Sequence, residues 1–283
     1  MLQPERRRIQ QSEECREQQP EFHKERCICG CHNVQHLWYD NGMFDIHSHI
    51  IYGVDDGSRT IEESIQLIEM DKKQGVTDII ATPHYYVSHP SDPDRILRRL
   101  EEIRKQLREQ GLDEGIRLYP GNEVLWFESM AEKLNSGEIL PLGDSRFTLV
   151  EFYPPESWDT ILRAVRKLRS AGWHPILAHA ERFIALRGPG EGRKSRLAEL
   201  ISQGAYIQLS TQPFSGGIFD STANFCKAAV KNNEVQFLGT DMHRPHRRPP
   251  EWAAAVKYIR RKADRPDDLL QKNAERMVGK QDL

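Results

Sequence analysis

From Met43 to the C-terminus, short apolar runs alternate with longer segments in which apolar residues recur at helical spacing. The runs "MFDIH" and "TDIIAT" are typical of buried strands, and the segment "TIEESIQLIEMDKKQG" between them is typical of an amphipathic helix. In that helix Thr60 and Glu63 have the spacing of a capping box, and Gly75 is placed to end it. Strands and helices that alternate in this way predict a parallel sheet.

The same pattern continues through seven strand–helix units. Strands are predicted at 43–47, 77–82, 116–124, 147–152, 174–179, 205–210 and 235–241, and helices at 60–75, 92–111, 127–137, 158–172, 193–204, 220–233 and 251–263, with a terminal helical stretch near 267–278. Such an α/β chain forms a sheet that is either doubly wound or closed as a barrel.

Residues 1–42 have a different composition, rich in Glu, Gln and Arg and poor in aliphatic side chains. Such a segment buries too little surface to offset its ordering entropy, so we expect an extension that is disordered or a loose helix, followed by the functional domain at 43–283. Within it, "CICGCH" (27–32) has the spacing of a metal knuckle, but no second ligand pair follows, so the support for a structural zinc site is weak.

Charge and cysteine content exclude several classes of protein. The net charge of −2 favours neither nucleic acid nor an acidic membrane as a partner, and no apolar run is long enough to span a bilayer. The N-terminus lacks the apolar stretch of a secretory signal. Five cysteines, four of them before residue 32, do not form a disulfide framework. We therefore expect a cytoplasmic protein, and the oligomeric state stays open.

Ionisable side chains follow six of the seven predicted strands. They are His47 and His49, His84, Glu123, Glu151, His179, and Asp241 with His243, and Asp55 and Asp56 occupy a turn after the first strand. The carboxyl ends of parallel strands in a barrel meet at one face, so these groups are expected to converge. Read singly, His84 is a turn histidine, Glu151 a strand-end charge and Asp241 a helix cap, but together they predict a metal site.

The chemistry of this set indicates several hard or borderline cations. Five imidazoles and the four carboxylates of Asp56, Glu123, Glu151 and Asp241, with no thiolate, suit Mn, Fe or Zn. Nine side chains exceed the ligand number of one ion, so two or three ions that share bridging carboxylates are the economical interpretation. Three divalent ions against four carboxylates leave about two positive charges, which would attract a phosphate dianion.

Two arginines lie close to predicted ligands. Arg182 follows His179 in "HAER", and Arg248 follows His243 in "HRPHRRPP". A guanidinium group matches phosphate oxygens in two-point fashion, so we expect both to bind phosphate, although each alone would be read as a surface ion pair and Arg247 competes with Arg248 for the role. No cysteine is followed six positions later by arginine, and no Walker A, GxSxG or GxGxxG motif is present, which leaves metal-assisted chemistry.

The segments "DIHSHIIYGVDDGSRTIEES", "ATPH", "GNEV", "LVEF", "ILAHAER" and "GTDMHRPHRRPP" closely resemble the PHP-superfamily tyrosine-protein phosphatases, the manganese-dependent enzymes of bacterial capsule and exopolysaccharide clusters. The resemblance implies a distorted (β/α)7 barrel, the PHP domain, with three divalent ions, most plausibly Mn²⁺, with Fe or Zn as alternatives. It implies one ion on His47, His49, Glu123 and Asp241, a second on Glu123, Glu151 and His179, a third on Asp56, His84 and His243, and phosphate on Arg182 and Arg248.

The resemblance further implies a phosphotyrosyl protein substrate, an autophosphorylating bacterial tyrosine kinase. The chain departs from the family in its N-terminal extension, in Tyr85, where relatives often have a second histidine, and in the doubled Arg247–Arg248. The expected reaction is metal-assisted hydrolysis of a phosphomonoester, in which His84 or Asp56 supplies any proton that the leaving phenolate needs. Two alternatives stay open: a PHP phosphatase for a small metabolite such as histidinol phosphate, and a non-catalytic PHP module that binds a partner.

Overall fold

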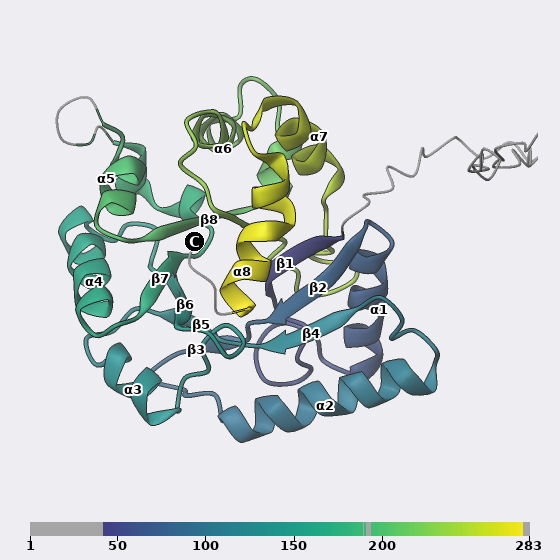
Figure 1. Cartoon of the computed structure of the whole chain (residues 1–283). Helices are drawn as coiled ribbons and strands as arrows, with labels where there is room; N and C mark the ends of the chain where they lie inside the picture. Colours follow the sequence, from purple (N-terminus) through teal and green to yellow (C-terminus); the bar gives the residue numbers. More distant parts are fainter. Residues whose placement is uncertain (1–41, 189, 191–193, 280–283) are drawn as a thin grey trace, which may run out of the picture. The chain divides into compact units, whose positions relative to one another are not determined.

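The computed structural model describes residues 42–188, 190 and 194–279 of the chain (Figure 1). The predictions for the N-terminal extension and for "CICGCH" lie outside these residues, and the domain boundary at Met43 stays a prediction. Within the described residues, no helix is both long enough and apolar enough to cross a bilayer.

Within the described residues, nine strands form two parallel sheets. The strands are β1 (Met43–Ser48), β2 (Val76–Ala81), β3 (His84–Tyr85), β4 (Arg117–Pro120), β5 (Glu123–Leu125), β6 (Phe147–Glu151), β7 (His174–Leu177), β8 (Tyr206–Ser210) and β9 (Phe237–Gly239). The smaller sheet has the order β1-β2-β4 and the larger the order β3-β5-β6-β7-β8-β9. Every pair of neighbours is parallel, as the alternation of strands and helices predicts.

The seven predicted strands account for eight of the nine: the one predicted at 116–124 is interrupted and gives β4 and β5, whereas β3 lies beyond the strand predicted at 77–82. Thr82 and Pro83 separate β2 from β3, and Gly121 and Asn122 separate β4 from β5. Proline lacks an amide hydrogen and cannot continue a ladder, which explains the first break. The carboxyl end of β9 meets that of β1, where the Asp241 amide donates to the His47 carbonyl at 2.8 Å. The distorted (β/α)7 barrel is thereby confirmed.

In the part of the chain that the structure describes, eight α-helices cover the outside of this curled sheet and one end of it (Figure 1). They are α1 (Ile61–Lys72), α2 (Pro93–Glu109), α3 (Met130–Ser136), α4 (Trp158–Ser170), α5 (Arg196–Ser202), α6 (Ser221–Lys231), α7 (Ala253–Lys262) and α8 (Asn273–Val278). Short 3₁₀ turns η1 (Ala180–Arg182), η2 (Ile184–Arg187) and η3 (Gln212–Ser215) follow β7 and β8, and the π-helical turn η4 (Asp268–Lys272) precedes α8. The predicted cap of the first helix is confirmed, since Thr60 accepts from the Glu63 amide.

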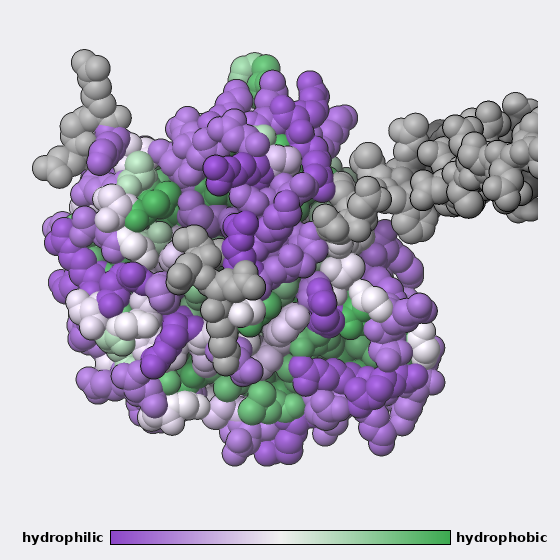
Figure 2. Space-filling view, viewed as in Figure 1, coloured by the Kyte–Doolittle hydropathy of each residue, from purple (hydrophilic) through white to green (hydrophobic). Residues whose placement is uncertain are grey.

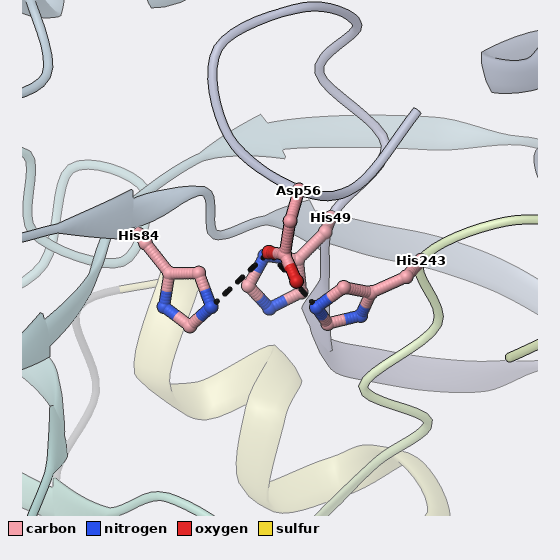
Figure 3. Close-up of side chains that lie close together, drawn as sticks. All are labelled: His49, Asp56, His84 and His243. Atoms are coloured by element: carbon pink, nitrogen blue, oxygen red, sulfur yellow. Dashed lines mark ion pairs between the residues drawn. The ribbon is translucent and has the colours of Figure 1, made fainter. Parts of the chain in front are cut away.

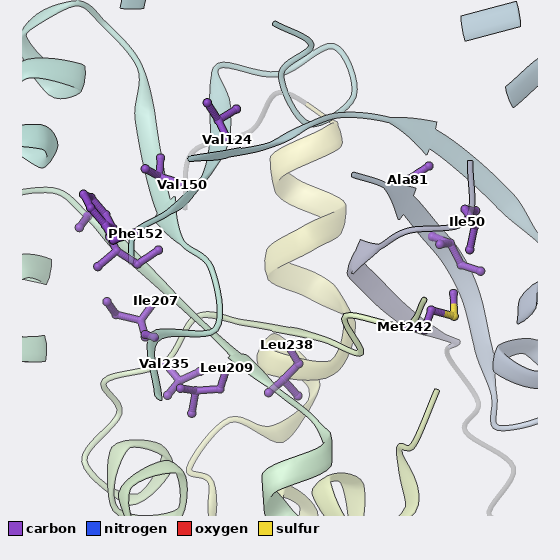
Figure 4. Packing of buried hydrophobic residues seen from close by; sticks show 14 of the residues in the cluster. Ile50, Ala81, Val124, Val150, Phe152, Ile207, Leu209, Val235, Leu238 and Met242 are labelled. Carbon is purple, nitrogen blue, oxygen red and sulfur yellow. The ribbon is translucent and has the colours of Figure 1, made fainter. Parts of the chain in front are cut away.

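The apolar core has two layers, one on each side of the sheet. Outward-facing strand residues such as Val150, Ile207 and Leu238 pack against the helices (Figure 4). Inward-facing residues, among them Phe44 and Leu149, form a second cluster that includes Ala274 and Met277 of α8. α8 and these apolar side chains fill the end of the barrel opposite to the carboxyl ends of the strands, where the predicted ligands lie.

Candidate active site

The nine predicted ligands converge at the carboxyl ends of the strands. Eight of them have ligand atoms in three groups, each within 4.8 Å: His47, His49, Glu123 and Asp241; His49, Asp56, His84 and His243; and His84, Glu123 and Glu151. The ninth, His179, lies beside Glu123 and Glu151 but is in none of these groups. The convergence follows from the barrel, because parallel strands bring residues that are far apart in sequence to one rim. The first group is entirely buried and the second opens toward solvent at Asp56.

The buried group is centred on the carboxylates of Glu123 and Asp241. The Nε2 atoms of His47 and His49 lie 3.2 and 3.3 Å from Glu123 Oε2, and 3.5 and 3.3 Å from Asp241 Oδ1. Burial opposes ionisation of both carboxyl groups, but the charge of His47 and the other histidines outweighs it and holds the pKa of Glu123 and of Asp241 well below the usual range. Both carboxylates are therefore ionised at neutral pH.

Two side chains outside the predicted set orient the paired imidazoles. His47 Nδ1 lies 3.3 Å from the Gln208 side-chain oxygen, and His49 Nδ1 lies 2.8 Å from Asp55 Oδ2. An acceptor at Nδ1 places the ring hydrogen there and leaves the lone pair on Nε2, which is the arrangement that fits a metal-ligating histidine. Accordingly, the two Nε2 atoms face each other across 3.3 Å.

Unsatisfied buried atoms test whether this donor set fits cations. Glu123 Oε2 is buried and makes no hydrogen bond, although nitrogen atoms of His47, His49 and His84 lie 3.0–3.3 Å away. Buried His84 Nδ1 and His179 Nδ1 also have no hydrogen-bond partner. Buried polar atoms are normally paired, and lone pairs that point at one another in this way are the geometry of ligands around an ion. The residues therefore fit divalent cations.

Glu123 also connects the buried group to Glu151 and His179. His179 Nε2 lies 2.7 Å from Glu123 Oε1 and 3.4 Å from Glu151 Oε1, and His84 Nδ1 lies 3.8 Å from Glu151 Oε2. Burial lowers the pKa of His179, but its hydrogen bond to Glu123 raises it to about 9. The group of ligand atoms around Glu123 and Glu151 contains His84, whereas the family resemblance assigns His179 to these two carboxylates. Both imidazoles lie close to Glu123 and Glu151.

The outer group joins Asp56 to three imidazole rings (Figure 3). Asp56 Oδ1 lies 3.6 Å from His84 Nε2 and 3.4 Å from His243 Nε2. The contact with His243 is the main reason that the pKa of Asp56 is lowered. Arg244 holds the turn that carries Asp56, because its guanidinium donates to the carbonyls of Asp56 and Gly57 at 3.0 and 3.2 Å.

The two predicted arginines meet at Asp241. Its Oδ2 accepts a hydrogen bond from Arg182 and another from Arg248 at 3.3 Å, while its Oδ1 faces His47 and His49. The side chains of Arg182 and Arg248 are 38% and 45% exposed, so both guanidinium groups are accessible from solvent. Arg248, rather than the exposed Arg247, is the one of the pair that contacts the site.

The backbone is strained at two of the ligand positions. His179 and Asp241 have φ of 32° and 54°, in the left-handed region that residues other than glycine rarely occupy. Gly57 lies so close to the first strand that a Cβ there would come within 2.3 Å of the His49 carbonyl. A shift of register in β1 between Asp45 and Ser48 also falls beside His47. Irregular backbone thus occurs at residues that carry the predicted ligands or lie next to them.

Sequence reasoning did not identify Gln208 as part of the site, and it placed Asp55 in the turn beside the histidines without giving it a role. Gln208 lies on β8, whose end carries no histidine or carboxylate, and an amide in a strand gives no signal of its own. Asp55 was visible beside Asp56 in the same turn, but spacing alone does not tell which of two adjacent aspartates faces a histidine. Arg244 was likewise hidden among the basic residues after His243.

Comparison with known proteins gives a consistent set of relatives. The family model described as "Capsular polysaccharide synthesis, CpsB/CapC" matches residues 43–279. The tyrosine-protein phosphatase CpsB of Streptococcus agalactiae is 35% identical over 243 residues, 83% of this chain and 98% of that protein. The putative tyrosine-protein phosphatase CapC of Staphylococcus aureus is 30% identical over 208 residues, 73% of this chain and 79% of that protein.

Solved structures show the same fold. A crystal structure from work on YwqE of Bacillus subtilis and CpsB of Streptococcus pneumoniae, described as unique metal-dependent tyrosine phosphatases, superposes with a TM-score of 0.76 at 24% identity and covers 85% of this chain and 96% of that one. Histidinol phosphate phosphatase from Lactococcus lactis gives a TM-score of 0.51 at 13% identity, covering 78% of this chain and 94% of that one. At these identities the likeness concerns the fold alone.

Proposed function

This chain belongs to the CpsB/CapC family of capsular polysaccharide synthesis, and from that premise we propose that it is a metal-dependent phosphomonoesterase that hydrolyses phosphotyrosine on proteins. The observation that carries the proposal is the arrangement at Asp241. One oxygen of this carboxylate faces the buried histidines and the other accepts from Arg182 and Arg248. Cation ligands and anion-binding guanidinium groups thus meet at one residue, and this arrangement suits phosphate-ester hydrolysis.

We assign the cations to the three groups of ligand atoms. His47, His49, Glu123 and Asp241 would hold one ion, Glu123 and Glu151 a second with His179 or His84, and Asp56, His84 and His243 a third. A count of three and Mn²⁺ as the ion, with Fe or Zn as alternatives, fit imidazole and carboxylate ligands without thiolate. When bound, such ions neutralise phosphate charge and lower the pKa of water, so that a nucleophile forms near neutral pH.

The protein's own side chains have three tasks in this mechanism. Arg182 and Arg248 bind the phosphate oxygens and take up the charge that develops on them in the transition state. Gln208 and Asp55 hold the Nδ1 hydrogens of His47 and His49, which keeps both Nε2 atoms directed at the centre. His84 and Asp56 hold the open side of the centre, where the phenolate would leave. As proposed ligands, and with the pKa of Asp56 lowered, they keep no proton for it, and its parent pKa of about 10 makes it a fair leaving group without one.

The substrate follows from the relatives. CpsB and CapC are named as tyrosine-protein phosphatases, so we propose a phosphotyrosyl protein, with a tyrosine kinase that controls capsule or exopolysaccharide synthesis in the cytoplasm as the first candidate. Hydrolysis of a small metabolite such as histidinol phosphate is not favoured, because the CpsB and CapC relatives at 30% to 35% identity are named tyrosine-protein phosphatases. A purely scaffolding role does not explain the complete ligand set.

A phosphatase assay with a chelator tests this function. The purified full chain is loaded with Mn²⁺ and given a phosphotyrosyl peptide or histidinol phosphate, each with and without EDTA, and its metal content is measured by elemental analysis. We expect rapid release of phosphate from the peptide, at least tenfold slower release from histidinol phosphate, and loss of both with EDTA. Activity that persists in metal-free protein, or a preference for histidinol phosphate, would contradict the proposal.

A further inference from the structure

Large apolar side chains that face solvent are unevenly distributed over the described residues. Six are exposed, and five of them lie on loops that follow strands: Val87, Tyr153, Ile184, Ile218 and Phe219. The sixth, Leu97, lies on helix α2. Single exposed apolar residues are ordinary on a protein surface, but a concentration of them at one edge marks an interaction site. We call these five residues the apolar rim.

Three members of the apolar rim come directly after residues of the proposed active site. Val87 follows His84 by three positions, Tyr153 follows Glu151 by two, and Ile184 follows Arg182 by two. The strands that precede them, β3, β6 and β7, lie on one side of the larger sheet, with only β5 between β3 and β6. The Ile184 amide donates to the Pro154 carbonyl at 3.0 Å, which joins the loops that carry Tyr153 and Ile184.

The two remaining members lie on the loop that follows β8, the next strand in the sheet. Ile218 and Phe219 are 78% and 96% exposed, and Figure 2 shows a hydrophobic projection at the top of the view, above the place of α6 in Figure 1. Arg187 ties this segment to the loop of Ile184, since its Nη2 donates to the Glu181 carbonyl at 2.8 Å and to Thr222 Oγ1 at 2.9 Å. The loops that carry Tyr153, Ile184, Ile218 and Phe219 are therefore joined in an arc.

Tyr86 connects this arc to the site. Its ring stacks on His84, with centroids 5.0 Å apart and an interplanar angle of 27°, and the His89 amide donates to its carbonyl at 2.9 Å, which holds the turn that also carries Val87. An aromatic wall beside the cations suits the phenyl ring of phosphotyrosine. The apolar loops beyond Tyr86 suit the peptide chain that is attached to that ring.

We propose that the apolar rim binds the apolar side chains that flank the phosphotyrosine of a protein substrate, an inference that rests on the proposed phosphatase function. Chain segments on either side of the phosphorylated residue must cross the loops around the site when the phosphate reaches the cations. Burying apolar flanking residues there removes solvent-exposed surface from both partners. A metabolite that extends only a few atoms from its phosphate would bury no apolar surface on the apolar rim.

Matched substrates and variants test the inference. Two phosphotyrosyl peptides, one with leucine and isoleucine on both sides and one with glycine and serine, are compared with p-nitrophenyl phosphate on the Mn²⁺-loaded full chain. The variants are Ile184→Ser, Phe219→Ser and their combination, and Leu97→Ser is the control because it removes an exposed apolar side chain away from the apolar rim. The oligomeric state of each variant is measured in parallel.

We expect the wild type to prefer the apolar peptide by at least tenfold in kcat/KM, mainly through KM. The double variant should lose most of that preference while Leu97→Ser keeps it, and hydrolysis of p-nitrophenyl phosphate should change less than twofold in all variants. Equal rates for the two peptides would overturn the inference. A change of oligomeric state without loss of the preference would also overturn it, because the apolar rim would then form contacts between copies of the chain. If the wild type hydrolyses none of the three substrates, the proposed function itself fails.

Discussion

At the scale of single residues, the site depends on the different partners of the two oxygens of one carboxylate. Asp241 directs Oδ1 at the Nε2 atoms of His47 and His49 and Oδ2 at Arg182 and Arg248. Its left-handed backbone, with φ of 54°, shows that packing maintains this orientation against local strain. The arginines can therefore be removed from the site without removal of any proposed cation ligand.

The first prediction concerns Arg182. We expect Arg182→Ala to lower kcat for a phosphotyrosyl peptide by roughly 10²–10³, because a positioned donor to transition-state charge is lost, while metal content stays as in the wild type. Steady-state kinetics and elemental analysis measure the two effects. Arg247→Ala, which changes an exposed neighbour of Arg248, serves as the control. An unchanged rate would remove Arg182 from the mechanism.

The second prediction concerns Asp55, whose Oδ2 accepts from His49 Nδ1 at 2.8 Å and from the His84 amide at 3.0 Å. Asp55→Asn should weaken metal binding by about 10- to 100-fold, the usual effect of changing a group that orients a ligand. Metal titration followed by calorimetry measures the affinity, and excess metal should restore most of the activity. Asp144→Asn, at an exposed position, is the matched control. An unaltered affinity would show that His49 does not need this partner.

At the scale of elements, helix α1 carries a buried acid against the segment that leads into α7. Trp252 Nε1 donates to Asp71 Oδ1 at 2.7 Å. Burial and the nearby carboxyl group of Asp45 raise the pKa of Asp71 well above its ordinary value. The folded protein therefore keeps a proton on Asp71 at a pH at which the unfolded chain has lost it.

The third prediction follows from that difference. A native state that binds more protons loses stability as the pH rises from the ordinary carboxyl range to the raised pKa, by at most about 1.4 kcal/mol per pH unit for one group. Asp71→Asn, which keeps an acceptor for Trp252, should therefore unfold at a higher urea concentration than the wild type at pH 8, with a difference that shrinks toward pH 5. Asp113→Asn, at an exposed position, is the control. A difference that is constant with pH would contradict this account.

At the scale of the whole molecule, the described residues form one barrel in which the candidate active site and the inner apolar cluster lie at opposite ends. The apolar cluster with Met277 of α8 fills the interior, and the polar groups gather at the carboxyl ends of the strands. The first strand begins at Met43, and the family match begins at the same residue. The residues before it supply none of the proposed ligands.

The fourth prediction is that a chain starting at Met43 keeps the activity. Deletion of residues 1–42 should leave kcat/KM for a phosphotyrosyl peptide within about twofold of the full chain, because each ligand and both arginines lie in 43–283. The kinetics are compared at equal metal loading, and circular dichroism checks that the shortened chain folds. A folded but inactive product would show that the extension takes part in the function.

The sequence alone determined the alternation of strands and helices, the seven units and the register of ionisable residues at strand ends, because each of these depends on local periodicity and on the common direction of parallel strands. It also indicated which side chains were candidates, from His47 to His243. Local pattern carries no information about a partner contributed by another strand, and for that reason Gln208 was not assigned. It also does not tell which of the adjacent Asp55 and Asp56 faces His49.

Only the tertiary structure decided which oxygen of Asp241 faces the histidines, that Arg248 rather than Arg247 contacts it, and that exposed apolar residues lie on loops at the same edge of the larger sheet. Two adjacent residues such as Arg247 and Arg248 are equivalent in composition and differ only in the direction that the folded backbone gives them. Direction in space depends on strand closure, a break at Pro83 and strained φ angles at His179 and Asp241, none of which is encoded in a short stretch of sequence.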